Sequence, residues 1–565
     1  KYKYLVLRNS GSDWGMSHFR DALMTGLVKN WDLDVQAYQP SRVYINGKYW
    51  GIYNLREKIN SHYFQSHYGI DRDSIDILEH RYTVRKGSTK YYNKLLNFLE
   101  THDLADAQNY KQVTAMMDVD NFMRHQIAQI YCDNQDAGGN IRYWRPRREG
   151  AKWRWVLFDT DYGFGLHDKN AYKNNSLAFH TYADGDNWPN PAWSTFLLRK
   201  LLMNKEFKEK FVARFCDYLN TDLLPTHVNN KVDEIVATLA PEMPLHCKRW
   251  DISLKTWNNQ IANIRNFANQ RPTYIRQYMK EYFALQDEIN LTFNCDENGI
   301  LRINDNIEVK NDSLKGIYFS NNPIEIEAIA KFGYKFVGWK GIDGIQNRQS
   351  MKISFYPKEI NNTIQPIFEK YDHPLANKLI INEICYYNPN SGDWVELFNK
   401  SDQAIDLYQW KITDGNNIFT IQEHITIKSD SFFILTNDIQ NFKKVHPSLN
   451  NISHCDLRFD KKHEEISLIA PDNGIVDNVS YSVEPSDNIS TISLLSPYLN
   501  NSYQDNWEIL KGNGSPSRAN PFYLKSQIII SQKRWTRIGL LTGVTLILLT
   551  LIFYKKKVKF FLNVF

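Results

Sequence analysis

Acidic and amide side chains recur between residues 133 and 161, and they are the groups in this chain best suited to chemistry. Asp136 and Asn140 lie in the polar stretch YCDNQDAGGN, and Asp159 and Asp161 follow the apolar run WRWVLF. Between them, IRYWR and WRWVLF have the composition of two strands joined by a basic turn. We expect this hairpin to bring Asp136 and Asn140 close to Asp159 and Asp161.

Three carboxylates and an amide oxygen that converge in one cleft point to a bound cation, because the carboxylates otherwise repel each other. Ligand sets made only of oxygen suit Mg²⁺ or Mn²⁺. Gly163 and Gly165 come directly afterwards and allow the chain to turn close to a phosphate. Protein kinases have the same order of groups: one Asp takes the substrate proton, while an Asn and a second Asp hold metal.

The match to the common protein-kinase motifs is incomplete. Asp136 and Asn140 are one position closer together than in those motifs, and no His-Arg-Asp triplet precedes them. The spacing alone therefore leaves two interpretations open, metal-assisted phosphoryl transfer and a hydrogen-bonded structural turn. A metal-dependent phosphodiesterase is less favoured, because no cluster of His residues accompanies the acids.

Size and composition indicate several globular domains. The chain has 565 residues, and single hydrophobic cores stop growing at about 250–300 residues. Its net charge is +5, from 68 basic and 63 acidic residues, which is too balanced for a nucleic-acid-binding protein. The six cysteines are scattered without a Cys-x-x-Cys pair, which argues against zinc or thioredoxin-like sites and predicts buried free thiols.

The first 285 residues combine strands with helices. We expect a strand over 2–8, a helix over 17–27 and a hairpin whose strands meet at Asn46-Gly47, a strong turn signal. From 176 to 283 apolar residues recur mostly at helical spacings. Proline is favoured at the first position of a helix, so Pro272 is expected to open a new one.

The rest of the chain is β-rich and ends in an apolar segment. Residues 286–371 alternate apolar and polar positions, and 377–523 contain short strands separated by turns, as in a β-sandwich. Residues 538–554 carry no charge and have basic clusters at both ends, which predicts a transmembrane helix. The basic tail 555–565 is then expected in the cytoplasm, with the bulk of the chain outside it.

Longer motifs in the first half resemble the CotH (spore coat protein H) kinase family. That family's D-N-x-D-x-x-x-N-x-x-x-W loop is matched by residues 133–144, and its W-x-x-x-x-D-x-D-x-(G/A)-F strand end is matched from Trp155, with a shortened gap. LRNSGSDW, HFRDALMTGL and SHYGID also agree, and VYINGKYWGIYNLREKI at 43–59 is the most specific segment. The similarity runs from residue 1 to about 275.

This resemblance implies an atypical protein-kinase fold that uses ATP with Mg²⁺ or Mn²⁺ to phosphorylate Ser or Thr of secreted or surface proteins. Asp136 would accept the proton of the acceptor hydroxyl. Asn140 and Asp159 would hold the metal, with Asp161 as a further metal ligand or an orienting group.

Three more residues are candidates for nucleotide contact. Arg8 and Arg56 would contact phosphate, since guanidinium groups match its geometry. Glu57 would lie near the adenine or ribose, because LREKI falls where the hinge between kinase lobes is expected. A purely structural role for each of the three stays open. Relatives usually carry an upstream R-G-x-S segment and a Lys-containing strand, and this sequence starts after that point. We expect it to be truncated; the alternative is a protein that has lost part of its nucleotide pocket.

Two β-rich segments have resemblances of their own. FGYKFVGWKG at 332–341 and the later IQPIFEK resemble small β repeats of bacterial surface proteins. Residues 377–523 resemble a lamin-tail domain, with INEI, WVEL and DLYQW in series and GNGSPSRANP near the end. The second resemblance implies an immunoglobulin-like sandwich whose motif residues form core and turns.

The predicted fold class is therefore multidomain: an α+β kinase-like domain, all-β modules and a C-terminal transmembrane helix. The alternative to a membrane-anchored kinase is a non-catalytic pseudokinase that acts as a surface adhesin or scaffold. In that case the β modules would bind a surface protein or a polysaccharide. No nucleic-acid partner is expected.

Overall fold

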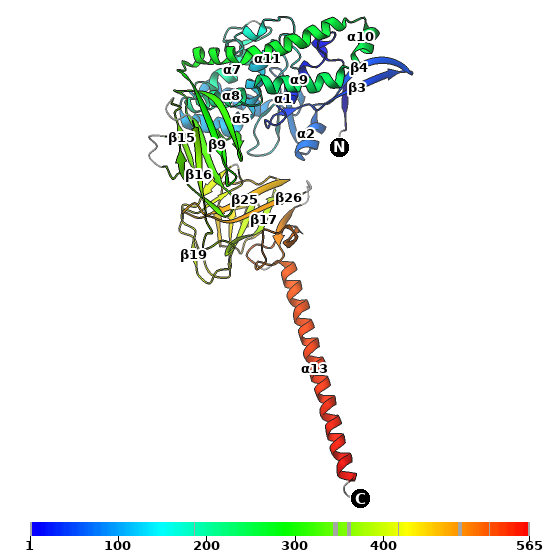
Figure 1. Ribbon diagram of the computed structural model, residues 1–565, viewed down its shortest axis with the longest axis vertical. Coiled ribbons are helices and arrows are strands. Elements are labelled where there is room, and N and C mark those ends of the chain that lie inside the picture. Colours follow the sequence, from blue (N-terminus) through cyan, green and yellow to red (C-terminus); the bar gives the residue numbers. More distant parts are fainter. Residues whose placement is uncertain are drawn as a thin grey trace. The chain divides into compact units, whose positions relative to one another are not determined.

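The computed structural model describes residues 3–185, 187–342, 348–358, 363–415, 417–460, 462–483, 489–518 and 520–562. The chain forms two compact units (Figure 1). The first comprises Lys1–Asp296, Leu301–Ala328 and Trp339–Pro366, and the second comprises Glu297–Ile300, Ile329–Gly338 and Ile367–Phe565. The expected strand start at Tyr2 and the end of the expected basic tail, 563–565, lie outside the described residues.

A small antiparallel sheet opens the first unit. Its strands are, in spatial order, β1 (Leu5–Arg8), β4 (Lys48–Glu57) and β3 (Tyr38–Ile45). Asn46 and Gly47 join β3 to β4 with φ angles of 50° and 74°, so the predicted Asn-Gly turn is confirmed. Arg8 ends β1 and pairs with Asn54 of β4.

Two short helices flank this sheet. The helix expected over 17–27 is α1 (Arg20–Leu27), which buries Leu23 and Met24. Helix α2 (Ser61–Tyr68) follows β4 and begins at Asn60, whose side-chain oxygen accepts the first free backbone N–H groups of the helix.

A second, mixed sheet lies behind the acidic residues. Its strands are, in spatial order, β2 (Asp34–Val35), β8 (Arg154–Leu157), β7 (Arg142–Pro146), β5 (Ile75–Glu79) and β6 (Thr83–Lys86). Strands β7 and β8 form the predicted hairpin, and Trp144 and Trp155 are buried on it. Because β8 ends at Leu157, Phe158 already leaves the strand and starts the acidic turn.

Helices make up most of the remaining first unit. They are α3 (Lys90–Thr101), α4 (Ala107–Met116), α5 (Val119–Cys132), α6 (Ser176–Thr181), α7 (Ala192–Leu201), α8 (Lys205–Leu219), α9 (Pro225–Leu239), α10 (Met243–Trp250) and α11 (Leu254–Phe283). The expectation that Pro272 opens a helix is wrong, because Pro272 lies inside the continuous α11. The buried Arg271 donates hydrogen bonds to the carbonyls of Ile130 and Tyr131 at 2.9 and 3.0 Å, and these tertiary bonds stabilise the helix across the proline.

Short strands follow α11 as predicted. They are β9 (Glu288–Cys295), β10 (Gly299–Ile303), β11 (Ile307–Val309), β12 (Asp312–Phe319), β13 (Ile324–Ala330), β14 (Tyr334–Lys340), β15 (Lys352–Phe355) and β16 (Thr363–Lys370). β12 pairs antiparallel with β9 along its whole length, and β13 pairs with β15. Within the first unit, the buried Asp217 of α8 accepts hydrogen bonds from Asn304 and Tyr318 of this segment, at 2.8 and 2.9 Å.

The second unit contains a β-sandwich. One sheet has the order β24 (Ile452–His454), β23 (Ser431–Thr436), β18 (Trp394–Asn399), β17 (Leu379–Tyr387), β27 (Ser490–Leu494) and β28 (Trp507–Lys511). The other has the order β21 (Ile418–Thr420), β20 (Lys411–Thr413), β25 (His463–Ile469) and β26 (Ile475–Ser482). Ile381 and Leu397 from the first sheet and Ile412 and Leu468 from the second share one buried core, so the expected core role of these motif strands is confirmed.

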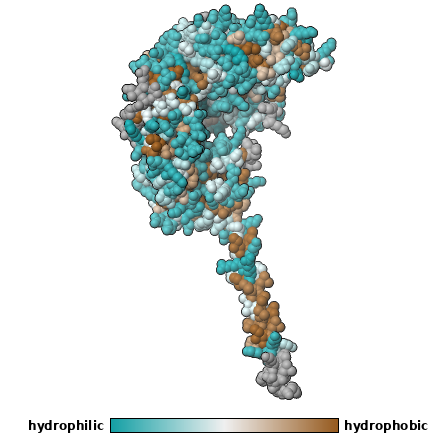
Figure 2. All heavy atoms as spheres, in the orientation of Figure 1, coloured by the Kyte–Doolittle hydropathy of each residue, from teal (hydrophilic) through white to brown (hydrophobic). Residues whose placement is uncertain are grey.

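The chain ends in the long helix α13 (Pro521–Leu562). It contains one stretch long and apolar enough to cross a membrane by length and composition, and that stretch is not buried in the protein. Figure 2 shows apolar residues gathered along this helix. All six cysteines are buried and free, as predicted.

Candidate functional site

The loop after α5 places Asp136 and Asn140 side by side. The helix ends at Asp133, which has a φ angle of 54°. The Asn140 Nδ2 donates to the Oδ2 of Asp136 at 2.7 Å, and the backbone N–H of Asp136 donates to the Oδ1 of Asn134 at 3.2 Å. The Asn134 side chain is held in turn by Gln129 of α5, at 2.8 Å. The Asp136 carboxylate is thereby fixed by a buried polar network that starts in α5.

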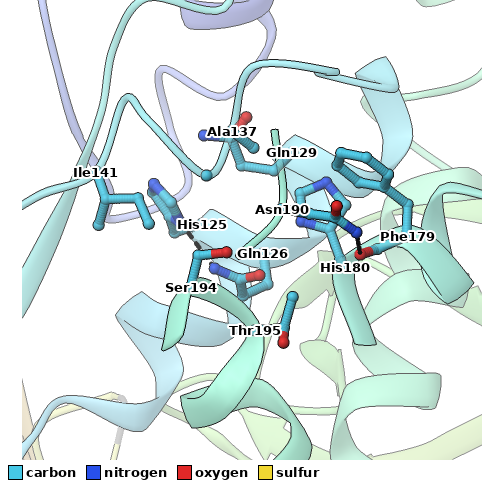
Figure 3. A pocket seen from close by; sticks show the side chains of 11 residues that line it. His125, Gln126, Gln129, Ala137, Ile141, Phe179, His180, Asn190, Ser194 and Thr195 are labelled. Carbon is cyan, nitrogen blue, oxygen red and sulfur yellow. Dashed lines mark hydrogen bonds between the residues drawn. The ribbon is translucent and has the colours of Figure 1, made fainter. Parts of the chain in front are cut away.

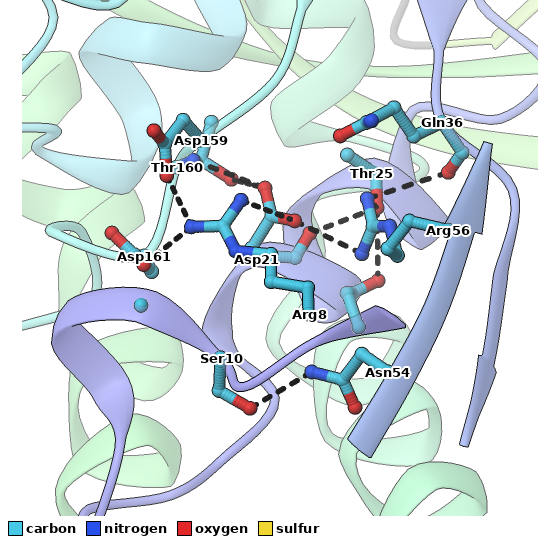
Figure 4. A network of polar contacts seen from close by, with 12 residues as sticks. Arg8, Ser10, Asp21, Thr25, Gln36, Asn54, Arg56, Asp159, Thr160 and Asp161 are labelled. Carbon is cyan, nitrogen blue, oxygen red and sulfur yellow. Dashed lines mark hydrogen bonds and ion pairs between the residues drawn. The ribbon is translucent and has the colours of Figure 1, made fainter. Parts of the chain in front are cut away.

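The acidic turn after β8 is tied to strand β1 by Arg8. The Arg8 Nη2 lies 2.7 Å from the Oδ2 of Asp161 and also contacts the carboxylate of Asp159 (Figure 4). The backbone N–H of Ser12 donates to the same Asp161 oxygen at 3.0 Å. Gly11 lies against this oxygen as well, since an added Cβ there would be only 2.1 Å from it. Arg8 and the segment after β1 therefore neutralise and position both carboxylates.

Backbone contacts join the loop that holds Asp136 to the turn that holds Asp159 and Asp161. The N–H of Phe164 donates to the carbonyl of Cys132 at 2.7 Å. A Cβ on Gly163 would lie 2.8 Å from that same carbonyl, so glycine is required for this close approach. Because of this contact, the loop with Asp136 and the turn with Asp159 and Asp161 form one structural piece.

Two residues of the site, Asp21 and Thr160, were not among the sequence candidates. Asp21 of α1 accepts hydrogen bonds from the backbone N–H and the hydroxyl of Thr160, at 3.0 and 3.1 Å. Its other oxygen lies 2.9 Å from Arg56 and 3.8 Å from Arg8 (Figure 4). A single carboxylate on α1 thus links β1, β4 and the acidic turn. In the sequence, Asp21 looks like an ordinary polar position on an amphipathic helix.

The carboxylates of the site differ in their affinity for protons. Burial and the charge of Asp159 raise the pKa of Asp136 to about 6. Burial and Asp159 also raise the pKa of Asp161, to about 7, although Arg8 opposes the shift. Burial opposes ionisation of Asp21, but Arg56, Arg8 and the Thr160 bonds outweigh it and lower the pKa of Asp21. Asp21 is therefore a permanent anion, while Asp136 titrates near neutrality.

A cavity of about 490 Å³ lies between the two sheets of the first unit. Its lining is strongly basic and contains Arg8, Arg56, Lys58, Arg85, Lys86 and Arg142. Apolar lining comes from Val6, Ile59, Ile77 and Phe158. Among the described residues no Asp or Glu lines it, and the cavity reaches the acidic turn through Arg8 and Phe158. Its size and charge suit an anionic ligand with an apolar ring.

The three nucleotide candidates fall in different places. Arg8 and Arg56 line the cavity, but Glu57 does not. The Glu57 carboxylate instead lies 2.8 Å from the Nε2 of His67 and accepts the backbone N–H of Ala37 at 3.0 Å. The structure therefore gives Glu57 two protein partners that tie β4 to its neighbours, next to a cavity wall formed by the following Lys58.

A much smaller cavity, of about 20 Å³, lies beneath the Asp136 loop (Figure 3). His125, Gln129 and His180 are buried around it, and in each of them the Nε2 atom has no hydrogen-bond partner. Burial lowers the pKa of both imidazoles to about 3, so both are neutral. The space is suited to a water-sized group and is far too small for a nucleotide.

Metal-binding residues can be assessed only within the described part of the chain. There, no group of three or more His, Cys, Asp or Glu side chains is placed to hold a metal ion. Asp159 and Asp161 share Arg8, and Asn140 turns its amide nitrogen toward Asp136. The site thus offers two neighbouring carboxylates rather than a complete protein cage.

Comparison with protein families identifies two segments of the chain. The model of the CotH kinase protein family matches residues 2–275, which contain the acidic turn, the Asp136 loop and the basic cavity. Residues 2–275 are a CotH kinase family domain. A lamin tail domain matches residues 374–482, within the sandwich. The resemblances to the CotH kinase family and to the lamin-tail domain are confirmed, while the resemblance of residues 332–341 to small β repeats stays a prediction.

The other comparisons add little to this assignment. Comparison with curated proteins gives no significant match. One solved structure, a DUF4876 family protein from Bacteroides thetaiotaomicron VPI-5482, is 12% identical over 37% of this chain and 66% of its own length, with a TM-score of 0.12. That TM-score is too low to bear on the fold. CotH family members are atypical protein kinases, and the family implies the use of ATP.

Proposed function

We propose that this protein is an ATP-dependent protein kinase of the CotH type, which phosphorylates Ser or Thr residues of secreted or surface proteins. The observation that carries the proposal is the basic cavity of about 490 Å³ that opens onto the acidic turn. Its volume is in the range of small-molecule sites, and its six cationic side chains match a triphosphate. Val6, Ile77 and Phe158 offer apolar surface for a purine.

In this proposal Asp136 is the general base. A base must be ionised when it takes a proton, and a pKa of about 6 leaves Asp136 ionised at neutral pH while keeping it basic enough to act. The amide of Asn140 orients the carboxylate through the 2.7 Å hydrogen bond. The proton of the acceptor hydroxyl would pass to Asp136 as the oxygen attacks the phosphate.

The carboxylates of Asp159 and Asp161 would hold Mg²⁺ or Mn²⁺, together with the side-chain oxygen of Asn140. Two carboxylates on one turn fit Mg²⁺, which usually keeps several waters and takes its other ligands from phosphate. When bound, the ion withdraws negative charge from the phosphates. Arg8 contacts both carboxylates and lines the cavity, which supports a role in which it would contact phosphate and the metal ligands together.

Lys58 is one of four cations of the cavity that were not sequence candidates, together with Arg85, Lys86 and Arg142. Arg85 is paired with Glu79. Arg56 is paired with Asp21, Arg142 with Glu79 at 2.7 Å, and Lys86 with Asp73 at 2.7 Å. Lys58 has no ion-pair partner among the described residues. We assign it to phosphate contact, a role for which the sequence showed no upstream lysine.

One observation favours the alternative of a non-catalytic scaffold. Arg8 already offsets the charges of Asp159 and Asp161, so these carboxylates do not need a metal ion for stability. In that case the domain would retain the fold, and the sandwich would bind a surface protein or a polysaccharide. The raised pKa of Asp136 has no evident use in a scaffold.

Helix α13 would anchor the protein in a membrane. Its apolar stretch lies between the basic residues Lys533, Arg534 and Arg537 and the lysines from Lys555 onward. With the lysine-rich end in the cytoplasm, the part of the chain that precedes α13 would lie outside it, where the acceptor proteins would also be.

The test is phosphate transfer by the full chain in detergent micelles, with labelled ATP and Mg²⁺ or Mn²⁺. Asp136→Asn and Asp159→Asn serve as paired variants of nearly unchanged shape. Transfer by the wild type that both variants lose supports the kinase. Metal-dependent ATP binding without transfer supports the scaffold, and no ATP binding at all refutes both the kinase and the nucleotide site.

A further inference from the structure

We propose that Trp188 forms the acceptor-binding wall of this kinase and selects polypeptides with a large apolar side chain within about three residues of the phosphorylated Ser or Thr. This inference rests on the proposed function and goes beyond it by naming the kind of acceptor. It is carried by the way the segment 187–191 is seated on the loop that holds Asp136.

Two buried glycines lie directly against the segment that carries Trp188. An added Cβ on Gly139 would lie 2.0 Å from the Trp188 ring, and one on Gly138 would lie 2.0 Å from the carbonyl of Pro189. Any side chain at either position would push the segment away. The close approach of backbone and ring therefore depends on these two glycines.

The segment is also held in place by contacts of Asn190. The Asn190 Nδ2 donates to the carbonyl of Phe179 in α6 at 3.0 Å. Gly185 packs against the carbonyl of Asn190, since an added Cβ there would lie 2.0 Å from that oxygen. These contacts of Asn190 hold the segment that carries Trp188, and little conformational entropy is lost when a ligand contacts the ring.

The ring nevertheless remains in solvent. Trp188 is 58% exposed, while Gly138 and Gly139 beneath it are buried. A single exposed apolar residue is common on protein surfaces. What distinguishes Trp188 is its position, because Gly139 directly precedes Asn140, whose amide donates to the Asp136 carboxylate.

This position lies apart from the nucleotide. Trp188, Asp136 and Asn140 are absent from the lining of the basic cavity, which is formed by β1, β4 and the second sheet. Phosphoryl transfer needs the attacking and leaving oxygens roughly in line, so the acceptor must approach from the side that the nucleotide leaves free. In this proposal the Asp136 loop and Trp188 provide that side.

The position of the Trp188 ring near Asp136 decides which side chains of an acceptor polypeptide can contact it. The acceptor oxygen must come within about 3 Å of the Asp136 carboxylate. An extended polypeptide spans about 3.3–3.6 Å per residue. Side chains within about three residues of the acceptor therefore pass over Trp188, and apolar ones bury the exposed ring.

The experiment uses the full chain in detergent micelles with Mg²⁺ and ATP, and a synthetic peptide library with one central Ser and varied flanking residues. The wild type is expected to favour peptides with Leu, Ile, Phe or Met within three positions of the Ser. Trp188→Ala should abolish this preference and raise KM for the best peptide about 10-fold, while KM for ATP stays unchanged. Trp188→Phe should retain the preference.

Gly139→Ala provides an independent route to the same result, because it displaces the ring without removing it. Tyr44→Ala is the matched control: Tyr44 is also 58% exposed but lies at the β3–β4 turn. ATP binding by each variant verifies that the domain is folded. If Trp188→Ala keeps the wild-type preference and KM, the inference is wrong while the kinase stands. If the wild type binds ATP but phosphorylates no peptide, the proposed kinase and this inference fall together.

Discussion

The guanidinium of Arg8 bridges the carboxylates of Asp159 and Asp161, and its Nη2 lies 2.7 Å from the Oδ2 of Asp161. Arg8 belongs to β1, and the two acids follow β8 of the other sheet. The bridge therefore joins the two sheets that enclose the basic cavity, at the point where phosphate and metal would meet.

Replacement of Arg8 should disrupt both roles. Arg8→Met removes the bridging cation, so the pKa of Asp161, which burial already raises, should rise further. We expect ATP affinity to fall about 10-fold or more, because a charge-assisted phosphate contact is lost. Isothermal titration with ATP and Mg²⁺ measures this. Arg8→Lys keeps the charge without the bridging geometry and should be intermediate; an unchanged affinity in Arg8→Met would contradict the assignment.

The pH dependence of transfer should report Asp136. Its pKa is raised to about 6, so the base is ionised above this value and protonated below it. We expect kcat/KM to rise as pH increases through about 6 and then to level off. Assays between pH 5 and 8 test this. Asp136→Asn should give a low rate with no inflection near 6; an unshifted wild-type profile down to pH 5 would exclude Asp136 as the titrating base.

Loss of Asp21 should be more damaging than its distance from the reacting atoms suggests. Asp21→Ala leaves the buried Arg56 and the partly buried Arg8 without their shared anion, and breaking a buried pair costs about 3–5 kcal/mol. It also frees Thr160, in the middle of the acidic turn. Thermal unfolding and ATP titration should both show the loss.

The matched variant for this position is Asp21→Asn. It keeps the shape, and its Oδ1 can still accept both hydrogen bonds from Thr160, so it should be less destabilised than Asp21→Ala but should remain weak in ATP binding. A fully stable Asp21→Ala would show that Arg8 and Arg56 do not depend on α1.

Local signals in the sequence predicted local structure well. The Asn46-Gly47 turn, the β7–β8 hairpin and the sandwich strands follow from alternation and turn residues, which act over a few positions. The hairpin also brought Asp136 near Asp159, as the effect of the Asp159 charge on the pKa of Asp136 shows.

Contacts across long sequence separations were not predictable in this way. Arg8 and Asp161 are 153 positions apart, and no spacing rule connects them. Asp21 was missed for the same reason, because its partners lie on three other segments. Pro272 shows the converse: a local rule predicted a helix start, but the tertiary bonds of Arg271 keep α11 continuous.

The contact between the two loops should be sensitive to one methyl group. Gly163→Ala places a Cβ 2.8 Å from the carbonyl of Cys132, a backbone atom that cannot move away freely. We expect destabilisation of about 1–3 kcal/mol and a loss of transfer larger than the loss of ATP binding, since Asp136 and Asp159 are pushed apart. Gly26→Ala is the control, because its nearest neighbour is the flexible end of Lys231 at 3.1 Å. Equal effects of both substitutions in thermal unfolding would show that the close contact between Gly163 and the carbonyl of Cys132 is not important.

The proposed membrane role of α13 makes a prediction that does not depend on catalysis. Its apolar stretch is exposed along its length, so in water it would present a large surface that favours aggregation, whereas a lipid bilayer would cover it. We expect the full chain to stay with the membrane fraction during alkaline carbonate extraction. Replacement of Leu546 and Leu549 by Arg places two charges near the middle of the stretch, which should cost several kcal/mol in a bilayer and release the protein into the soluble fraction. The same two replacements at the exposed Leu224 and Leu245 of the first unit should leave it in the membrane. Release of the unaltered chain by carbonate would instead mean that α13 binds another protein or lies on the membrane surface.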